Sequence, residues 1–195
     1  MRESYFLYRE SGSLLNLTRL HLTYYSTFKY RCTFQDPKDW YGSHVLPHPP
    51  EDQKMTVCGQ WDDFGSRTLY LKVLLADYEE KYAIIEMIGE WNDAIENDIM
   101  ELKREVLEKF MSKGIFKFIL IGENVLNYHS DGKDYYEELY EEVTDQNGWV
   151  VCLNMPEQTQ YDFKHAHLNR YVELVELDNW RVYKPFHLFK KIDGE

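Results

Sequence analysis

Two cysteines and two histidines in the first third of the chain are the residues best suited to metal chemistry. His44 and His48 are four residues apart, and Cys32 and Cys58 flank the pair. Thiolates and imidazoles are the ligands that Zn²⁺ prefers. However, each cysteine lies in a run with strand character, no Cys-x-x-Cys knuckle is present, and the histidines lie in a proline-rich stretch. A zinc-structured domain or a metal-dependent enzyme using these four residues is therefore an alternative only, and no cofactor is expected.

The other reactive side chains form no catalytic arrangement. Asp and Glu number 34, but a carboxylate pair serves as an acid–base dyad only where its surroundings tune the pKa values. The glutamates from Glu137 to Glu142 have the spacing of a solvated helix face. The sequence contains no glycine-rich phosphate loop, dinucleotide fingerprint or nucleophile elbow. We therefore expect a protein that is not an enzyme.

Composition limits the kinds of binding partner and the cellular compartment that we expect for this protein. The formal net charge of −12 over 195 residues argues against nucleic acid, which requires clustered Lys and Arg, and against an anionic membrane surface. No apolar run is long enough to cross a bilayer, and no signal peptide is recognisable. Three cysteines are too few for a disulfide framework, and Cys152 lies in an apolar run where it is expected to be buried. These features favour a cytoplasmic protein.

The chain divides into an irregular first part and an orderly second part. Residues 1–66 are expected to form a β-rich extension of unknown role. Within it, Leu17–Phe34 and Met55–Trp61 have strand character, and the proline-rich Gln35–Lys54 is expected to be a long loop. Residues 67–195 are expected to form one α/β domain.

The orderly part begins with a hairpin and a helix. The β-prone runs Leu69–Leu75 and Tyr82–Trp91 are separated by a short polar turn, which predicts an antiparallel pair. Asp93 and Glu96 have the spacing of a capping box, and Gly114 has the position of a helix stop. The residues between them that recur at helical spacing are Ile95, Ile99, Leu102, Val106 and Phe110.

Apolar runs then alternate with helical patterns to residue 177. In the second helix, the side chains expected to face inward are Tyr136, Leu139, Tyr140 and Val143. The expected elements are a strand at Ile115–Ile121, a helix at Asp134–Asp145, a strand at Trp149–Asn154, a helix from Pro156 to about His167, and a strand at Tyr171–Leu177. Such alternation predicts a mixed, mostly parallel sheet with helices, entered by the antiparallel hairpin.

This order of elements resembles the STAS family (sulphate transporter and anti-sigma factor antagonist domains) over about residues 67–177. Ile88-Gly89-Glu90-Trp91-Asn92 is similar to the family signature that leads into its first helix. His129-Ser130-Asp131-Gly132 lies where the family carries Asp-Ser-Ser/Thr-Gly. The other similar stretches are Phe118–Ile121, Gly148–Asn154 and Pro156–Leu177.

The resemblance implies a role for Ser130. In family members that act as anti-sigma factor antagonists, a partner kinase phosphorylates the first serine of the motif and thereby switches binding off. His129 and Asp131 replace the motif's Asp and its second Ser/Thr, so phosphorylation competes with a simpler hypothesis, in which Ser130 and Asp131 only cap the following helix.

The sequence therefore predicts a regulatory protein–protein interaction module of the anti-sigma factor antagonist type. We expect it to bind a regulatory kinase or an anti-sigma-like protein through the surface around a loop at Asn124–Lys133 and the helix after it. The contact candidates are Asn127, His129, Ser130, Asp131 and Gly132. A homodimer is compatible with these features, and a small-ligand carrier is a second alternative.

Overall fold

The computed structural model describes residues 55–56 and 64–194. They form a sheet in the order β1-β2-β3-β4-β5-β6. The strands are β1 (Met55–Thr56), β2 (Leu69–Asp77), β3 (Tyr82–Asn92), β4 (Lys117–His129), β5 (Trp149–Leu153) and β6 (Glu173–Val175). β1, β2 and β3 pair antiparallel, and β3 to β6 pair parallel. The predicted fold class, a mixed and mostly parallel sheet entered by an antiparallel hairpin, is confirmed.

The β2–β3 hairpin is closed by a turn in which Asp77 Oδ1 accepts hydrogen bonds from the backbone N–H groups of Glu79 and Glu80. At the other end of the hairpin, Gly89 has φ of 122°, a left-handed value that favours glycine. A Cβ at this position would collide with the carbonyl oxygen of Thr68. The glycine of the signature stretch is therefore required by the backbone geometry.

β4 is longer than the sequence predicted. It continues from Lys117 to His129, where a strand ending at Ile121 was expected. The extension pairs with β3 through Gly89↔Val125 and Trp91↔Tyr128, across two register shifts. The predicted Asn124–Lys133 loop is therefore wrong in its first half, because residues 124–129 are strand.

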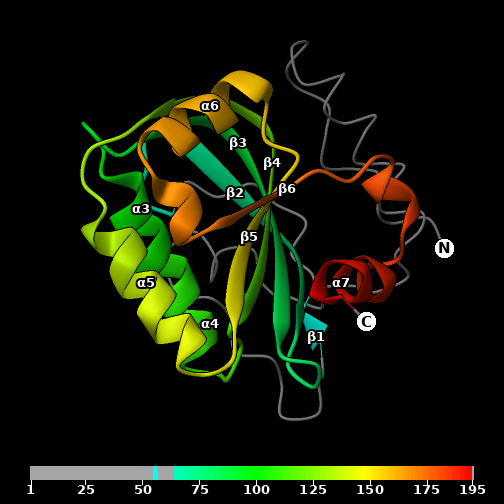
Figure 1. The fold of residues 1–195 in the computed structure, drawn as a ribbon. Helices are drawn as coiled ribbons and strands as arrows, with labels where there is room; N and C mark the ends of the chain where they lie inside the picture. The colour runs from blue at the N-terminus through cyan, green and yellow to red at the C-terminus, as the bar shows by residue number, and fades with distance from the viewer. Residues whose placement is uncertain (1–54, 57–63, 195) are drawn as a thin grey trace, which may run out of the picture.

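Three helical stretches cover one face of the sheet, as Figure 1 shows for α3 and α5. The first stretch consists of α3 (Asp98–Glu101), a π-helical segment (Leu102–Leu107) and α4 (Glu108–Met111); the others are α5 (Asp134–Thr144) and α6 (Glu157–His165). Val106, Phe110, Leu139 and Phe163 are buried in the larger apolar core between these helices and the sheet. The three predicted helices are thus confirmed as elements.

Some predicted details of these helices are wrong. The first helix begins at Asp98, and residues 93–96 form a turn, so Asp93 and Glu96 do not make a capping box. Ile95 lies in that turn with 76% of its surface exposed, and Tyr140 on α5 is also exposed. A left-handed Gly114 follows α4, as expected of a helix stop.

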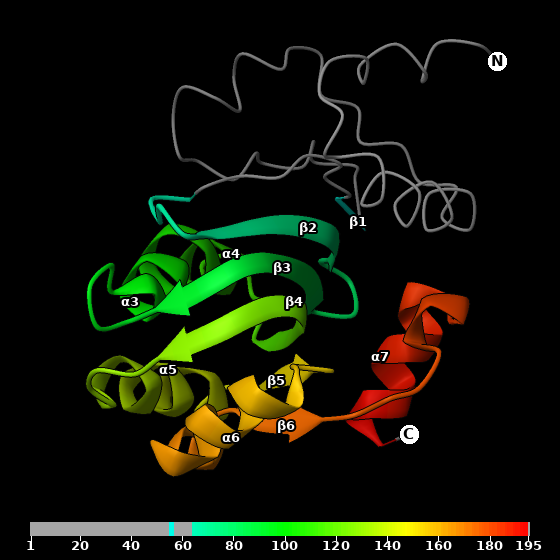
Figure 2. The same ribbon diagram turned by 90° about the horizontal axis from the view of Figure 1, so that it is seen from above.

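A second apolar core lies on the opposite face of the sheet. There a 3₁₀ turn (Trp180–Val182) and α7 (Pro185–Asp193) place Trp180, Leu188 and Phe189 against the strands. The Phe189 ring stacks on Tyr82 with 4.1 Å between ring centroids. Figure 2 shows α7 on the side of the sheet away from α3, α4 and α5. No element was predicted from the sequence in this region.

The proposed extension can be followed only in part. The paired strand β1 falls inside the predicted Met55–Trp61 run. The other predictions for residues 1–54 and 57–63, including Leu17–Phe34, lie outside the described residues, and the boundary at residue 66 stays a prediction. Among the described residues, no helix is long and apolar enough to cross a membrane.

Candidate functional site

The predicted loop follows β4 at the edge of the sheet where β3 also ends. Asn92 and His129 are the last paired residues of these two parallel strands, so their carboxyl ends lie side by side. In Figure 2 the arrowheads of β3 and β4 point the same way, toward α3 and α5. Open α/β sheets commonly bind ligands at the carboxyl ends of their strands.

Hydrogen bonds join the two strand ends. The carbonyl oxygen of His129 accepts from the backbone N–H of Asp93 at 2.9 Å and of Ala94 at 3.3 Å. The turn after β3 is thereby fixed beside the segment after β4. We call the exposed residues of these two segments the strand-end surface; they are Ala94, Ile95, Ser130, Asp131, Gly132 and Lys133.

The structure places the sequence-predicted residues as follows. Ser130, Asp131 and Gly132 are consecutive and exposed, and they lead to α5. A Cβ at Gly132 would meet nothing within 4 Å, so no neighbouring atom would clash with a larger residue at this position. His129 is the exposed last residue of β4. Asn127 lies within the strand and donates from Nδ2 to Glu90 Oε1 at 3.1 Å, so it belongs to the sheet rather than to the loop.

The capping role considered for Ser130 and Asp131 is wrong. The N-cap of α5 is Lys133, and no side chain makes a capping hydrogen bond there. Ser130 precedes this residue by three positions, too early for its hydroxyl to serve as the N-cap acceptor. The Ser130 side chain is therefore exposed to solvent without a helix-capping function.

A buried carboxylate supports the strand-end surface from beneath. Asp93 is 3% exposed. Its Oδ1 accepts hydrogen bonds from Trp91 Nε1 and the Ile99 N–H, both at 2.9 Å. Its Oδ2 accepts from the hydroxyl groups of Tyr128 at 2.9 Å and Tyr136 at 2.6 Å. One side chain thus connects the ends of β3 and β4, the start of α3 and the first turn of α5.

Burial raises the pKa of Asp93 above its ordinary value of 3.8, although the four donors oppose the shift. The neighbouring phenols shift as well. Burial and the Asp93 charge raise the pKa values of Tyr128 and Tyr136, so both hydroxyl groups keep their protons and donate. Local sequence patterns could not reveal this network, because Tyr128 and Tyr136 are 35 and 43 positions away from Asp93.

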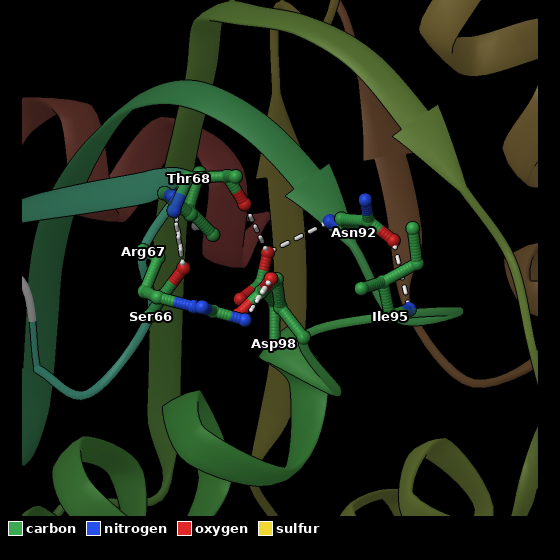
Figure 3. Close-up of polar contacts among 8 residues, drawn as sticks. Ser66, Arg67, Thr68, Asn92, Ile95 and Asp98 are labelled. Atoms are coloured by element: carbon green, nitrogen blue, oxygen red, sulfur yellow. Dashed lines mark hydrogen bonds and ion pairs between the residues drawn. The ribbon is translucent and has the colours of Figure 1, made fainter.

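A second buried carboxylate connects the start of β2 to the same turn (Figure 3). Asp98 Oδ2 accepts from the Asn92 N–H at 2.7 Å and from Thr68 Oγ1 at 3.4 Å. Burial raises the pKa of Asp98, and hydrogen bonds from Ser66 and the Asn92 backbone oppose this shift. Arg67 adds two hydrogen bonds of 2.8 Å to Glu96. The turn that carries Ile95 is therefore held on both sides.

The surroundings of Ser130 are acidic. Asp131, Asp134 and Glu137 lie within seven residues of it, and Lys133 is the one cation in this stretch. Lys133 lies 3.7 Å from Glu137 in an exposed pair, which contributes little stability. A new negative charge at Ser130 would therefore meet repulsion from its neighbours and little compensation.

The alternative metal site cannot be placed. Cys32, His44, His48 and Cys58 all lie outside the described residues. Within residues 55–56 and 64–194, no group of three or more His, Cys, Asp and Glu side chains has an arrangement that could hold a metal ion. Cys152 is a buried free thiol, as predicted, and burial raises its pKa to about 12.

No protein-family model and no curated protein matches the chain. The solved structures similar to it include anti-sigma factor antagonists, the class of protein that the sequence resembles. The unphosphorylated form of SpoIIAA is 11% identical, with a TM-score of 0.47 over 64% of this chain and 97% of that one. The phosphorylated Bacillus SpoIIAA is 11% identical, with a TM-score of 0.42 over 63% and 98% of the chains.

A third similar structure is a putative anti-sigma factor antagonist from Thermotoga maritima. It is 17% identical, with a TM-score of 0.41 over 56% of this chain and 87% of that one. Because these TM-scores are below 0.5, the fold assignment rests on the strand order and register described above.

Proposed function

We propose that this chain is a regulatory protein–protein interaction module of the STAS type. It works in the cytoplasm without catalysis or a cofactor, and it binds a regulatory kinase or an anti-sigma-like protein at the strand-end surface. The observation that carries the proposal is the combination of an exposed apolar residue, Ile95, with the exposed serine segment that follows β4.

The geometry supports binding because this surface is rigid from beneath. Asp93 and Asp98 hold the turn that displays Ile95, and the His129 carbonyl connects this turn to the Ser130 segment. A surface that is already ordered loses little conformational entropy when a partner binds. An isolated exposed isoleucine is common, but here it lies beside polar residues that can form the rim of an interface.

Phosphorylation of Ser130 is the regulatory part of the proposal. The hydroxyl is exposed, and the helix cap does not use it, so modification would leave α5 intact. A phosphate would add about −1.5 to −2 charges beside Asp131 and Asp134. The expected consequence is loss of a partner that tolerates the present surface but not a further negative charge.

Affinity capture with five immobilised versions of the chain tests both parts. The versions are wild type, Ile95→Asp, Ser130→Asp, Ser130→Ala and Glu80→Ala. Glu80 is an exposed control in the turn between β2 and β3, at the end of the sheet opposite the strand-end surface. Quantitative mass spectrometry of native lysate should show the same protein on wild type and Glu80→Ala and its loss on Ile95→Asp. Circular dichroism confirms that each version is folded.

The outcomes separate the two parts. Equal capture by Ile95→Asp and wild type would show that the strand-end surface is not the binding surface. Loss of capture by Ser130→Asp but not by Ser130→Ala supports the phosphorylation switch. Equal capture by Ser130→Asp refutes that switch and leaves the binding module in place.

A further inference from the structure

α7 presents a basic and partly apolar face to solvent. Pro185, Leu188 and Phe189 are its buried residues. Lys184, His187 and Lys191 follow one another at helical spacing on the other side and are exposed. Phe186 is 43% exposed, and the Lys190 ammonium group lies 5.6 Å from its ring centroid.

This local charge is opposite to that of the whole protein. Residues 181–193 contain four cations, Arg181, Lys184, Lys190 and Lys191, and one anion, Asp193, in a chain of net charge −12. Arg181 forms ion pairs with Glu86 and Glu123, and Asp193 interacts with Lys117 and Lys190, so the exposed cations of this region are Lys184 and Lys191. Just before α7, Val182 is also exposed. Cations beside exposed apolar groups suit an acidic partner that also offers an apolar side chain.

α5 offers that chemistry. Residues 134–145 contain six Asp and Glu residues and no Lys or Arg. Glu138 and Glu142 pair with Lys103, and Glu137 pairs with Lys133, so Glu141 and Asp145 supply the exposed negative charge at the C-terminal end of the helix. On its outer side, Tyr140 is 41% exposed. Glu141 follows it in the sequence, and the exposed Asp145 lies one helical turn after Glu141. α5 has 11 residues and α7 has 9, so the two helices have similar lengths. An acidic helix with an exposed ring thus complements a basic helix with an exposed ring.

We propose that copies of this chain associate head-to-tail, with the exposed face of α7 docked on the exposed face of α5 of the next copy. The two helices belong to cores on opposite faces of the sheet, so one chain cannot join its own two surfaces. For the same reason a two-fold pair cannot join both surfaces at once. The protein should therefore form head-to-tail assemblies of more than two copies, which are rings where the rotation between copies closes and open chains where it does not, and their mean mass increases with concentration.

Long-range repulsion between chains of charge −12 does not exclude this contact. At physiological ionic strength the Debye length is about 8 Å, so groups in contact dominate over distant charges. The proposal is independent of the proposed function, because Glu141 and Asp145 lie at the end of α5 away from Ser130.

The test is sedimentation of the full chain from low micromolar to several hundred micromolar concentration. Two double variants reverse the charge of one surface each: Lys184→Glu/Lys191→Glu on α7 and Glu141→Lys/Asp145→Lys on α5. The second pair places cations at a helix C-terminus, where the helix dipole favours them. We expect the mean mass of wild type to rise with concentration, and each variant to lower the association constant at least about tenfold.

Mixing the two variants provides the decisive measurement. In a mixture, the acidic α7 of one variant meets the basic α5 of the other, and the unchanged α5 of the first meets the unchanged α7 of the second. Association in the mixture should therefore be stronger than that of either variant alone. A control, Lys113→Glu/Lys164→Glu, makes the same change in net charge as the α7 variant on exposed residues outside α5 and α7 and should behave as wild type. A wild type that stays monomeric at all concentrations, or a mixture that fails to associate, overturns the proposal. An association that both variants retain overturns it as well.

Discussion

Replacing Asp93 by leucine removes the acceptor on which four donors converge. Leucine fills a similar volume but accepts no hydrogen bond. The hydroxyl groups of Tyr128 and Tyr136 are 3.3 Å apart and can still bond to each other. Trp91 Nε1 and the Ile99 N–H would lose their acceptor in a buried site. At about 1–3 kcal/mol for each unsatisfied buried donor, the expected loss of unfolding free energy is about 2–6 kcal/mol.

Asp93→Asn should cost much less and serves as the matched control. Its amide oxygen can keep the bonds from Trp91 and Ile99, while its NH₂ group donates to the tyrosine hydroxyl groups, which can reverse and accept. We expect a loss of about 1 kcal/mol. Urea denaturation followed by circular dichroism measures both losses, and an unchanged m-value shows that the same transition is compared.

The unfolding free energies of wild type and Asp93→Asn should also depend differently on pH. Because the folded-state pKa of Asp93 is raised, the folded protein binds this proton more tightly than the unfolded chain does. The stabilisation is complete below the unfolded pKa of about 3.9 and is lost as the pH rises through the raised folded value. Wild type should therefore gain stability relative to Asp93→Asn as the pH falls from neutral toward 4. If Asp93→Leu lost less than about 1 kcal/mol, or if the relative stability of Asp93→Asn did not depend on pH, the described role of this carboxylate would be wrong.

Three further substitutions test other parts of the structure. Ser130→Ala should change the unfolding free energy by less than about 0.5 kcal/mol, because the hydroxyl caps no helix; a loss above 1 kcal/mol in urea denaturation would contradict the exposed position. Val106→Asp should cost several kcal/mol, since it buries an unpaired carboxylate, and thermal unfolding should show a melting temperature many degrees lower. Gly89→Ala should cost about 2–4 kcal/mol, because the added methyl group meets the Thr68 carbonyl at a left-handed φ; a calorimetric trace like that of wild type would refute this.

Periodicity was sufficient to predict most of the sheet and three helices, because buried parallel strands are continuously apolar and amphipathic helices repeat every three or four residues. It failed where partners are distant in sequence. Asp93 and Glu96 have the residue types and spacing of a capping box. However, the carboxylate of Asp93 accepts hydrogen bonds from two tyrosines, one in β4 and one in α5. Only the folded chain brings those side chains together.

The sequence does contain a pattern that predicts helix α7, although this helix was not among the expected elements. Pro185, Leu188, Phe189 and Ile192 have helical spacing, with proline in the first turn and Gly194 just after the end. The sequence predicts the full length of β4 less clearly, because Glu123 and Asn127 interrupt the apolar pattern of the strand. Its second half is strand because β3 supplies a partner along its whole length.

The position of α7 affects how the domain can be shortened for laboratory work. The resemblance to a known family stops near residue 177, which suggests a natural place to cut. A fragment ending there would lose Trp180, Leu188 and Phe189 and would expose the apolar sheet face that they cover. The strand side chains of that apolar cluster are Leu74, Leu75, Tyr82, Ile84, Ile119, Ile121 and Leu153. A contiguous apolar patch of this kind promotes aggregation, so an expression fragment of this domain has to include the residues through Gly194.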